Sequence, residues 1–138
     1  MTKNSVEKLS GFYVVTGASS GIGLELAKLA AQDGAALPLV ADRDLGDAKR
    51  VVQQCGASEV ETLEVDLATV DGIDRVIDKI GSRSVDGLMA NAGHGLGEAF
   101  LTQKWDEIAH VIDTNITGTV SLIHRIGSGM VLRDKGRI

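Results

Sequence analysis

The chain of 138 residues is long enough for one domain with a buried core, and 43% hydrophobic against 24% charged residues is typical of a globular protein. Its formal net charge of −5 argues against nucleic acid or an anionic membrane as a partner, because either favours clustered Lys and Arg. Cys55 is the only cysteine, and the sequence shows no Cys and His spacing of the kind that binds zinc. Without a leader-like segment or a long apolar run, the sequence predicts a soluble, cytoplasmic protein.

Short apolar runs alternate with segments of helical periodicity in the first half of the chain. Residues 12–17 (FYVVTG) predict a buried strand, and residues 22–34 predict a helix that ends at a glycine. Residues 35–42 and 60–66 predict two more strands, with a helix between them over residues 45–56. The apolar face predicted for the first helix consists of Ile22, Leu26, Leu29 and Ala30.

The second half continues the same alternation. Residues 70–82 predict a helix, and residues 85–93 predict a strand that runs into a glycine turn. Residues 102–136 predict one extended helix, and the final residues 136–138 (GRI) predict the start of a further strand. The apolar positions of the long helix are Ile108, Val111, Ile112, Thr119, Leu122 and Ile126.

Strands that alternate with helices through short connections form right-handed βαβ units. The predicted fold class is therefore α/β, a doubly wound parallel sheet of the Rossmann type with strand order 3-2-1-4 and helices on both faces. The sheet is expected to be truncated at the start of its fifth strand. No linker or internal repeat divides the chain, so residues 1–138 are predicted to form one domain.

The segment TGASSGIG, residues 16–23, places three glycines between the first predicted strand and the first predicted helix. Glycine lets a pyrophosphate approach the backbone without meeting a Cβ, and the N-terminus of a helix favours an anion. The alternative is a tight turn that only packs the helix on the sheet. The position between strand and helix favours the phosphate site. The residues predicted to contact a dinucleotide in this turn are Gly17, Ser19, Ser20, Gly21, Ile22 and Gly23.

Asp42 ends the second predicted strand, where a carboxylate accepts hydrogen bonds from the ribose hydroxyls and repels a 2′-phosphate. A helix cap or a solvated loop charge is the alternative for an isolated Asp. The next residue, Arg43, offers a cation to a 2′-phosphate. NAD is therefore the favoured cofactor, and NADP is the alternative.

The third and fourth predicted strands end at the same crevice. Asp66, followed by Leu67, is predicted to accept a hydrogen bond from the adenine amino group, and capping of the next helix is its alternative role. Asn91, Ala92 and Gly93 end the fourth strand. The glycine permits close approach of a ligand, and the Asn side chain is expected to tie neighbouring strand ends together.

These motifs, in this order, resemble those of the classical short-chain dehydrogenases/reductases. Residues 16–23 resemble the cofactor loop of that family, and Asp66 with its following Leu resembles the acid that contacts adenine. Residues 90–93 (ANAG) resemble the family's NNAG turn, with Ala in place of the first Asn. Asn115 occupies the position of the family's helix Asn, and residues 136–138 resemble the start of the strand that leads to the catalytic Ser.

The resemblance implies NAD(P)-dependent oxidoreduction of a small alcohol or carbonyl compound. In that family a Tyr is the general acid/base, a Lys lowers its pKa, a Ser orients the substrate, and the Asn holds a water. Only Asn115 is carried over as catalytic, because the single tyrosine, Tyr13, has no Lys four residues later. The resemblance therefore implies a cofactor-binding portion that is inactive alone. A non-catalytic dinucleotide-binding or interaction module is the alternative.

Two residues beside these motifs have competing interpretations. His94 follows the glycine turn, where a solvated loop residue is favoured over a role in proton transfer. Trp105 lies near the start of the long helix and is predicted to be a packing anchor. The long helix is also expected to leave apolar surface uncovered and to make the chain a homo-oligomer. The residues expected on that surface are Ile108, Ile112, Leu122 and Ile126.

Overall fold

The computed structural model describes residues 8–41 and 44–138. Among these residues, one parallel sheet has the strand order β3-β2-β1-β4. The order and the parallel pairing confirm the predicted doubly wound topology. The strands are β1 (Tyr13–Thr16), β2 (Ala36–Ala41), β3 (Glu59–Glu64) and β4 (Gly87–Met89).

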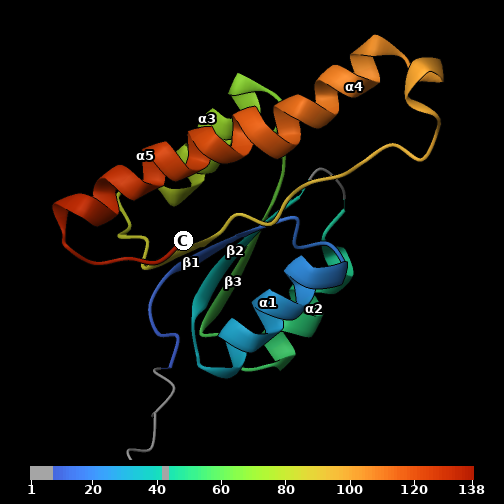
Figure 1. Cartoon of the computed structure of the whole chain (residues 1–138). Coiled ribbons are helices and arrows are strands. Elements are labelled where there is room, and N and C mark those ends of the chain that lie inside the picture. The colour runs from blue at the N-terminus through green and yellow to red at the C-terminus, as the bar shows by residue number, and fades with distance from the viewer. Residues whose placement is uncertain (1–7, 42–43) are drawn as a thin grey trace, which may run out of the picture.

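Helices cover both faces of this sheet (Figure 1). Helices α1 (Gly21–Gln32) and α2 (Gly46–Gln54) lie on one face. Helices α3 (Val70–Ile80) and α5 (Thr119–Leu132) lie on the other. Among the described residues, no helix has the length and apolar character needed to cross a bilayer.

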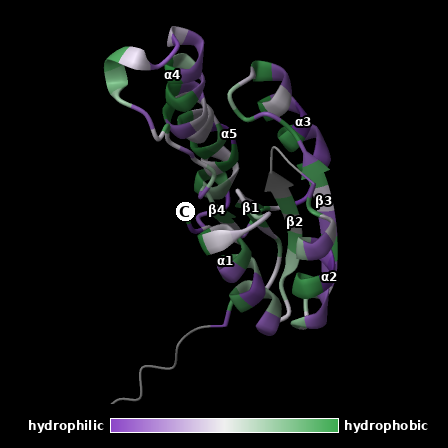
Figure 2. Ribbon diagram, turned by 90° about the vertical axis from the view of Figure 1, so that its right-hand side faces the viewer, coloured by the Kyte–Doolittle hydropathy of each residue, from purple (hydrophilic) through white to green (hydrophobic). Residues whose placement is uncertain are grey.

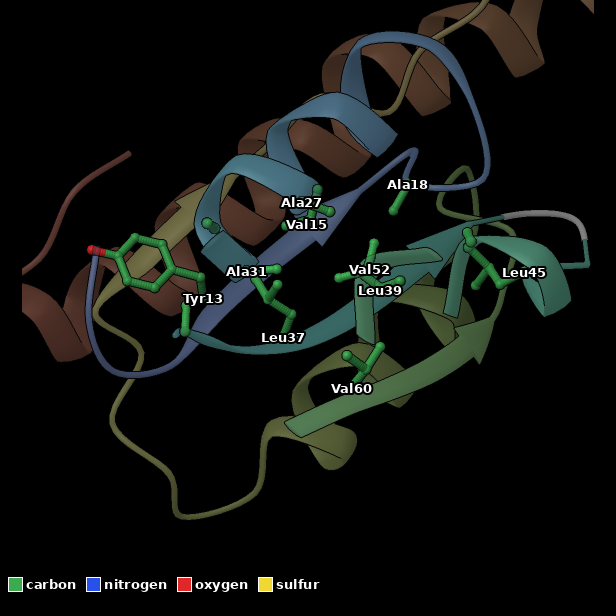
Figure 3. Close-up of a cluster of buried hydrophobic side chains, with 13 residues drawn as sticks. Tyr13, Val15, Ala18, Ala27, Ala31, Leu37, Leu39, Leu45, Val52 and Val60 are labelled. Atoms are coloured by element: carbon green, nitrogen blue, oxygen red, sulfur yellow. The ribbon is translucent and has the colours of Figure 1, made fainter. Parts of the chain in front are cut away.

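On the face that carries α1 and α2, helix α1 contributes small residues, which pack against larger side chains of the strands such as Leu37 and Leu39 (Figure 3). The apolar face predicted for α1 is wrong at Ile22, which is 74% exposed, and at Leu29, which is 57% exposed, whereas Ala30 is buried as predicted. Small residues let this helix lie close to the strands, so Ile22 and Leu29 lie outside the core, while Leu24 packs against its edge. The buried positions of α1 are Gly23, Ala27, Ala30 and Ala31.

The opposite face is packed through larger side chains from α3 and α5. Leu122 is 1% exposed and Ile126 is 6% exposed, so the expectation that these two residues face solvent is wrong. They lie in a cluster with buried residues of α3 and of the strands, including Val76 and Val14. Helix α3, rather than a partner molecule, covers this part of α5.

The last residues add the beginning of a fifth strand beside β4. The N–H of Leu88 donates to the Arg137 carbonyl at 2.9 Å, and the N–H of Arg137 donates to the Asp86 carbonyl at 3.1 Å. This parallel bridge confirms the predicted strand start. The Asp86 carboxylate accepts the N–H of Phe12 at 3.0 Å and pairs with Lys135 at 3.1 Å. The Phe12 hydrogen bond, followed by Lys135, holds the pKa of Asp86 below its usual value.

The long C-terminal helix is interrupted, and the prediction of one regular helix is wrong in this respect. Helix α4 (Trp105–Ile112) passes into a π-helical segment, η2 (Asp113–Gly118), before α5 begins. Gly118 is buried, and a side chain there would collide with the Leu67 carbonyl. The wide turn therefore coincides with the place where the helix contacts the loop after β3.

The segment leading into α4 carries apolar side chains on the protein surface. Trp105 is 71% exposed, so its predicted role as a packing anchor is wrong. A short 3₁₀ helix, η1 (Phe100–Thr102), precedes it, and Phe100 and Leu101 are also exposed. Figure 2 shows this end of the molecule standing apart from the sheet, with apolar residues on the connecting loop.

Candidate functional site

A pocket of about 330 Å³ lies where β1, β3 and β4 end. It joins the glycine turn, the residues after β3 and the turn after β4, as the sequence predicted for the carboxyl ends of parallel strands. Its walls are formed by Gly17, Ser19, Ser20, Ile22, Asp66, Leu67, Asn91, Ala92, Gly93, His94 and Thr114. Gly21 and Gly23 are not among the lining residues, and Asp42 and Arg43 lie outside the described residues.

Glycine is favoured at the three positions of the turn for different structural reasons. Gly17 has a φ of +66°, and a Cβ there would lie 2.8 Å from the Cα of Ala92. A Cβ on Gly23 would collide with the Gly17 carbonyl. Gly21 has a φ of +58°, but a Cβ there would meet nothing within 4 Å. The packing alternative therefore explains Gly17 and Gly23, while the backbone at Gly21 is open on its outer side.

The N-terminus of α1 borders the pocket. Ser20 is the N-cap, and within the described residues its side chain accepts no hydrogen bond from the first turn. The first turn of α1, residues 21–24, also carries no acidic side chain. The N–H of Leu24 donates to the Ser20 carbonyl at 3.4 Å, but the N–H groups before it in the first turn have no partner within the helix, and the helix dipole is positive at this end. An anion is the ligand that fits this arrangement.

Thr16 and Asn91 hold the ends of β1 and β4 together. The buried Thr16 hydroxyl accepts the N–H groups of Asn91 and Ala92, each at 3.0 Å. The Asn91 side chain donates to the Thr16 carbonyl at 3.3 Å. The predicted bridging role of Asn91 is therefore seen in these contacts, which fix the floor of the pocket.

Asn115 lies in η2 and fastens the turn after β4 to the helix. Its Oδ1 accepts the N–H of His94 at 2.9 Å, and its Nδ2 donates to the carbonyl of the same residue at 2.8 Å. A Cβ on Gly93 would lie 3.1 Å from this Oδ1, so glycine is the residue that fits here. The predicted catalytic role of Asn115 stays a prediction, and its contacts in this structure are with backbone groups.

Asp66 does not cap α3, which excludes the alternative role considered for it. Thr69 is the N-cap, and its hydroxyl accepts the N–H of Gly72 at 3.0 Å. The half-exposed Asp66 carboxylate accepts the N–H of Ala68 at 2.9 Å and lines the pocket. Nε2 of His110 lies 3.1 Å from each of its oxygens.

Thr114 and His110 are site residues that sequence reasoning missed. Thr114 is 8% exposed and lines the pocket, yet among the described residues its Oγ1 has no hydrogen-bond partner. A regular helical period gives no signal for it, because the π-helical segment rotates the helix faces at this point. His94 is exposed, in agreement with its interpretation as a solvated loop residue, and its Nε2 lies 2.9 Å from Nδ1 of His110. Within residues 8–41 and 44–138, no group of side chains is arranged to bind a metal ion.

The fold and this site together define a family. The sequence model of the short chain dehydrogenase family matches residues 12–138. The chain therefore belongs to the short-chain dehydrogenase/reductase family.

Individual members of the family share about a third of their residues with this chain. A 3-dehydrosphinganine reductase from Arabidopsis thaliana is 34% identical over 122 residues, which covers 87% of this chain and 36% of the relative. Human 17-beta-hydroxysteroid dehydrogenase type 1 is 32% identical, covering 91% and 40%. The crystal structure of L-sorbose reductase from Gluconobacter frateurii with NADPH and L-sorbose has a TM-score of 0.80 and 32% identity, covering 91% and 49%. The chain thus spans less than half the length of each of these three proteins.

Proposed function

We propose that this chain binds NAD or NADP in the pocket at the carboxyl ends of its strands, as the cofactor-binding portion of an oxidoreductase. The observation that carries the proposal is the meeting of three features in one pocket. These features are the uncapped first turn of α1, the Asp66 carboxylate, and a buried Thr114 hydroxyl without a described partner. The helix turn would bind an anion, the carboxylate would bind a hydrogen-bond donor, and the hydroxyl would bind a second polar group of the ligand.

The pyrophosphate is assigned to the glycine turn and the first turn of α1, and the adenine to Asp66. The nicotinamide half is assigned to the turn after β4, next to Asn115. The proposed contact residues are Gly17, Ser19, Ser20, Gly21, Ile22, Gly23, Asp66, Leu67, Asn91, Ala92 and Gly93. Asp42 and Arg43, which lie outside the described residues, are proposed to set the preference at the adenosine 2′ position.

The choice between the two cofactors is proposed from the charge at the end of β2. A carboxylate at Asp42 favours NAD, while the adjacent Arg43 favours NADP. The similar L-sorbose reductase was crystallised with NADPH, so both cofactors have to be compared directly. We expect NAD to bind more tightly to this chain.

An oxidoreductase reaction on a small alcohol or carbonyl compound is the proposed activity of the intact enzyme. The names of the similar reductases and dehydrogenases support this class of substrate. The 138 residues contain one tyrosine, Tyr13, which is buried in β1 and does not line the pocket. We therefore expect the 138-residue chain to bind a dinucleotide without turning over substrate. The alternative is a non-catalytic module, which would bind the dinucleotide but would not be part of an enzyme that turns over substrate.

Calorimetric titration with NAD, NADH, NADP and NADPH tests the proposal, with Thr114→Val as the site variant. The substitution removes a buried hydroxyl that lacks a described partner, so it should weaken dinucleotide binding while leaving the free protein stable. Thr117→Val is the matched control, because Thr117 lies in the same segment, is exposed, and its hydroxyl donates to the Asp113 carboxylate rather than facing the pocket. Absence of binding by the wild-type chain, or equal affinities for all three proteins, would contradict the proposed site.

A further inference from the structure

A chain of three side chains crosses the edge of the pocket. It runs from the Asp66 carboxylate to Nε2 of His110 at 3.1 Å, and from Nδ1 of His110 to Nε2 of His94 at 2.9 Å. The two imidazole rings are 5.0 Å apart between centroids and tilted by 47°. The three residues come from the loop after β3, from α4 and from the turn after β4. One linear set of hydrogen bonds thus connects three separate segments around the site.

The chemistry of these groups sets the direction of each hydrogen bond. An ionised carboxylate can only accept, so Nε2 of His110 must carry the proton that is donated to Asp66. In the neutral ring, Nδ1 of His110 is then an acceptor, and Nε2–H of His94 is its donor. The backbone of His94 is in turn held by Asn115. The anchored turn thereby favours the one tautomer of His110 that can hold Asp66.

We infer that His110 is a positioning residue for Asp66 and determines how strongly the pocket selects adenine. The inference rests on the proposed function, in which Asp66 accepts the adenine amino group. His110 contacts both carboxylate oxygens and restricts the rotation of a half-exposed side chain. When the His110 side chain is removed, Asp66 keeps the hydrogen bond from the N–H of Ala68 to its Oδ1. Its Oδ2 then has no partner among the described residues.

The adenine amino group supplies the discriminating chemistry. In the hypoxanthine analogue of the dinucleotide, a carbonyl oxygen replaces this amino group, so a donor becomes an acceptor. An oriented carboxylate should favour the amino group and disfavour the carbonyl. A carboxylate that rotates freely should distinguish the two bases less well. The ratio of the two affinities therefore reports on the orientation of Asp66.

The test measures dissociation constants of the purified chain for the preferred dinucleotide and for its hypoxanthine analogue. His110→Leu should lower the preference for adenine by about fivefold, the size of one typical net hydrogen bond. His110→Gln should restore most of the preference, because the Gln amide nitrogen donates from nearly the position of Nε2. His124→Leu is the matched control, since His124 is an exposed residue of α5 outside the pocket. The adenine preference of this variant should equal that of the wild type.

Three results separate the possible failures. If the wild-type chain binds neither dinucleotide, the proposed function fails, and this inference fails with it. If the wild type binds and His110→Leu keeps the full adenine preference, the inference alone is overturned. An equal loss of affinity for both dinucleotides in His110→Leu also overturns it, because that result indicates a general structural effect. A melting curve for each variant confirms that the comparison is made on folded protein.

Discussion

The two faces of the sheet are packed in different ways, and the difference explains where the site can form. Helix α1 contacts its face of the sheet through alanines and Gly23, so it lies close to the strands, whose Val and Leu side chains fill this core. The α3 and α5 face is filled by Leu, Ile, Val and Met side chains. Close packing of α1 requires glycine at its start, and it brings the open helix N-terminus beside the ends of β1 and β4. Large side chains at the buried positions of α1 would move the helix away from the pocket.

The largest effect is expected from a truncation on the α3 and α5 face. Leu122→Ala removes one of the largest fully buried side chains and should lower the free energy of unfolding by about 2–5 kcal/mol. Val120→Ala on the exposed side of the same helix is the control and should change it by less than about 0.5 kcal/mol. Denaturant unfolding measures both. Similar losses in the two variants would show that α5 is not packed as described.

A smaller loss of stability is expected on the α1 face, where the sensitive change is an enlarged side chain rather than a truncated one. Ala30→Leu adds volume where α1 contacts the sheet and should cost about 1–3 kcal/mol. Leu29→Ala, one residue earlier, should leave the unfolding free energy within about 0.5 kcal/mol of the wild type, because Leu29 is exposed. If the truncation destabilised more than the insertion, the buried face of α1 would be the one predicted from its large apolar residues.

A modest dependence on pH is expected from Asp86, which ties β1 to the start of the fifth strand. Its folded pKa is lowered, first by the hydrogen bond from the Phe12 N–H. The stabilisation is therefore complete above the unfolded pKa, about 4, and is lost as the pH falls through the lower folded pKa. Asp86→Asn should cost about 1 kcal/mol at neutral pH and make unfolding less sensitive to acid. Unfolding curves at pH 7 and pH 3 measure this, and an unchanged acid sensitivity would contradict it.

The smallest effect on stability is expected at the exposed segment before α4. Phe100, Leu101 and Trp105 form the apolar surface there, in place of the buried Leu122 and Ile126. Self-association of the chain stays a prediction, and Leu101→Glu should weaken it while changing the unfolding free energy by less than about 0.5 kcal/mol. Sedimentation velocity compares the two proteins over a range of concentrations. A wild-type chain that remains monomeric at tens of micromolar would overturn this prediction.

The sequence predicted the sheet well because its signals are local. Short apolar runs that end in Thr16, Asp66 and Asn91 mark the strands and place their ends at one edge. The buried face of α1 was not predictable from large side chains, since close packing on a parallel sheet selects alanine and leaves Ile22 outside.

The site was predicted where motifs are contiguous and missed where the fold brings distant residues together. The glycine turn contributes four residues to the pocket wall, and the turn after β4 contributes the continuous stretch Asn91–His94. His110 contacts Asp66 across 44 residues of sequence, and this contact depends on the course of α4. Thr114 enters the pocket from the π-helical segment, whose wider turn has no clear signature in a pattern of apolar residues.

The central claim is that the pocket at the strand ends binds a nicotinamide dinucleotide. Titration of the isotope-labelled chain with NAD and NADP, followed through the backbone amide signals, tests it most directly. The predicted result is a saturable change concentrated at Gly17–Ile22, Asp66–Leu67, Asn91–His94 and Thr114. Changes confined to the separate groove lined by Ile123, Met130 and Ile138, or no saturable change with either cofactor, would contradict the claim.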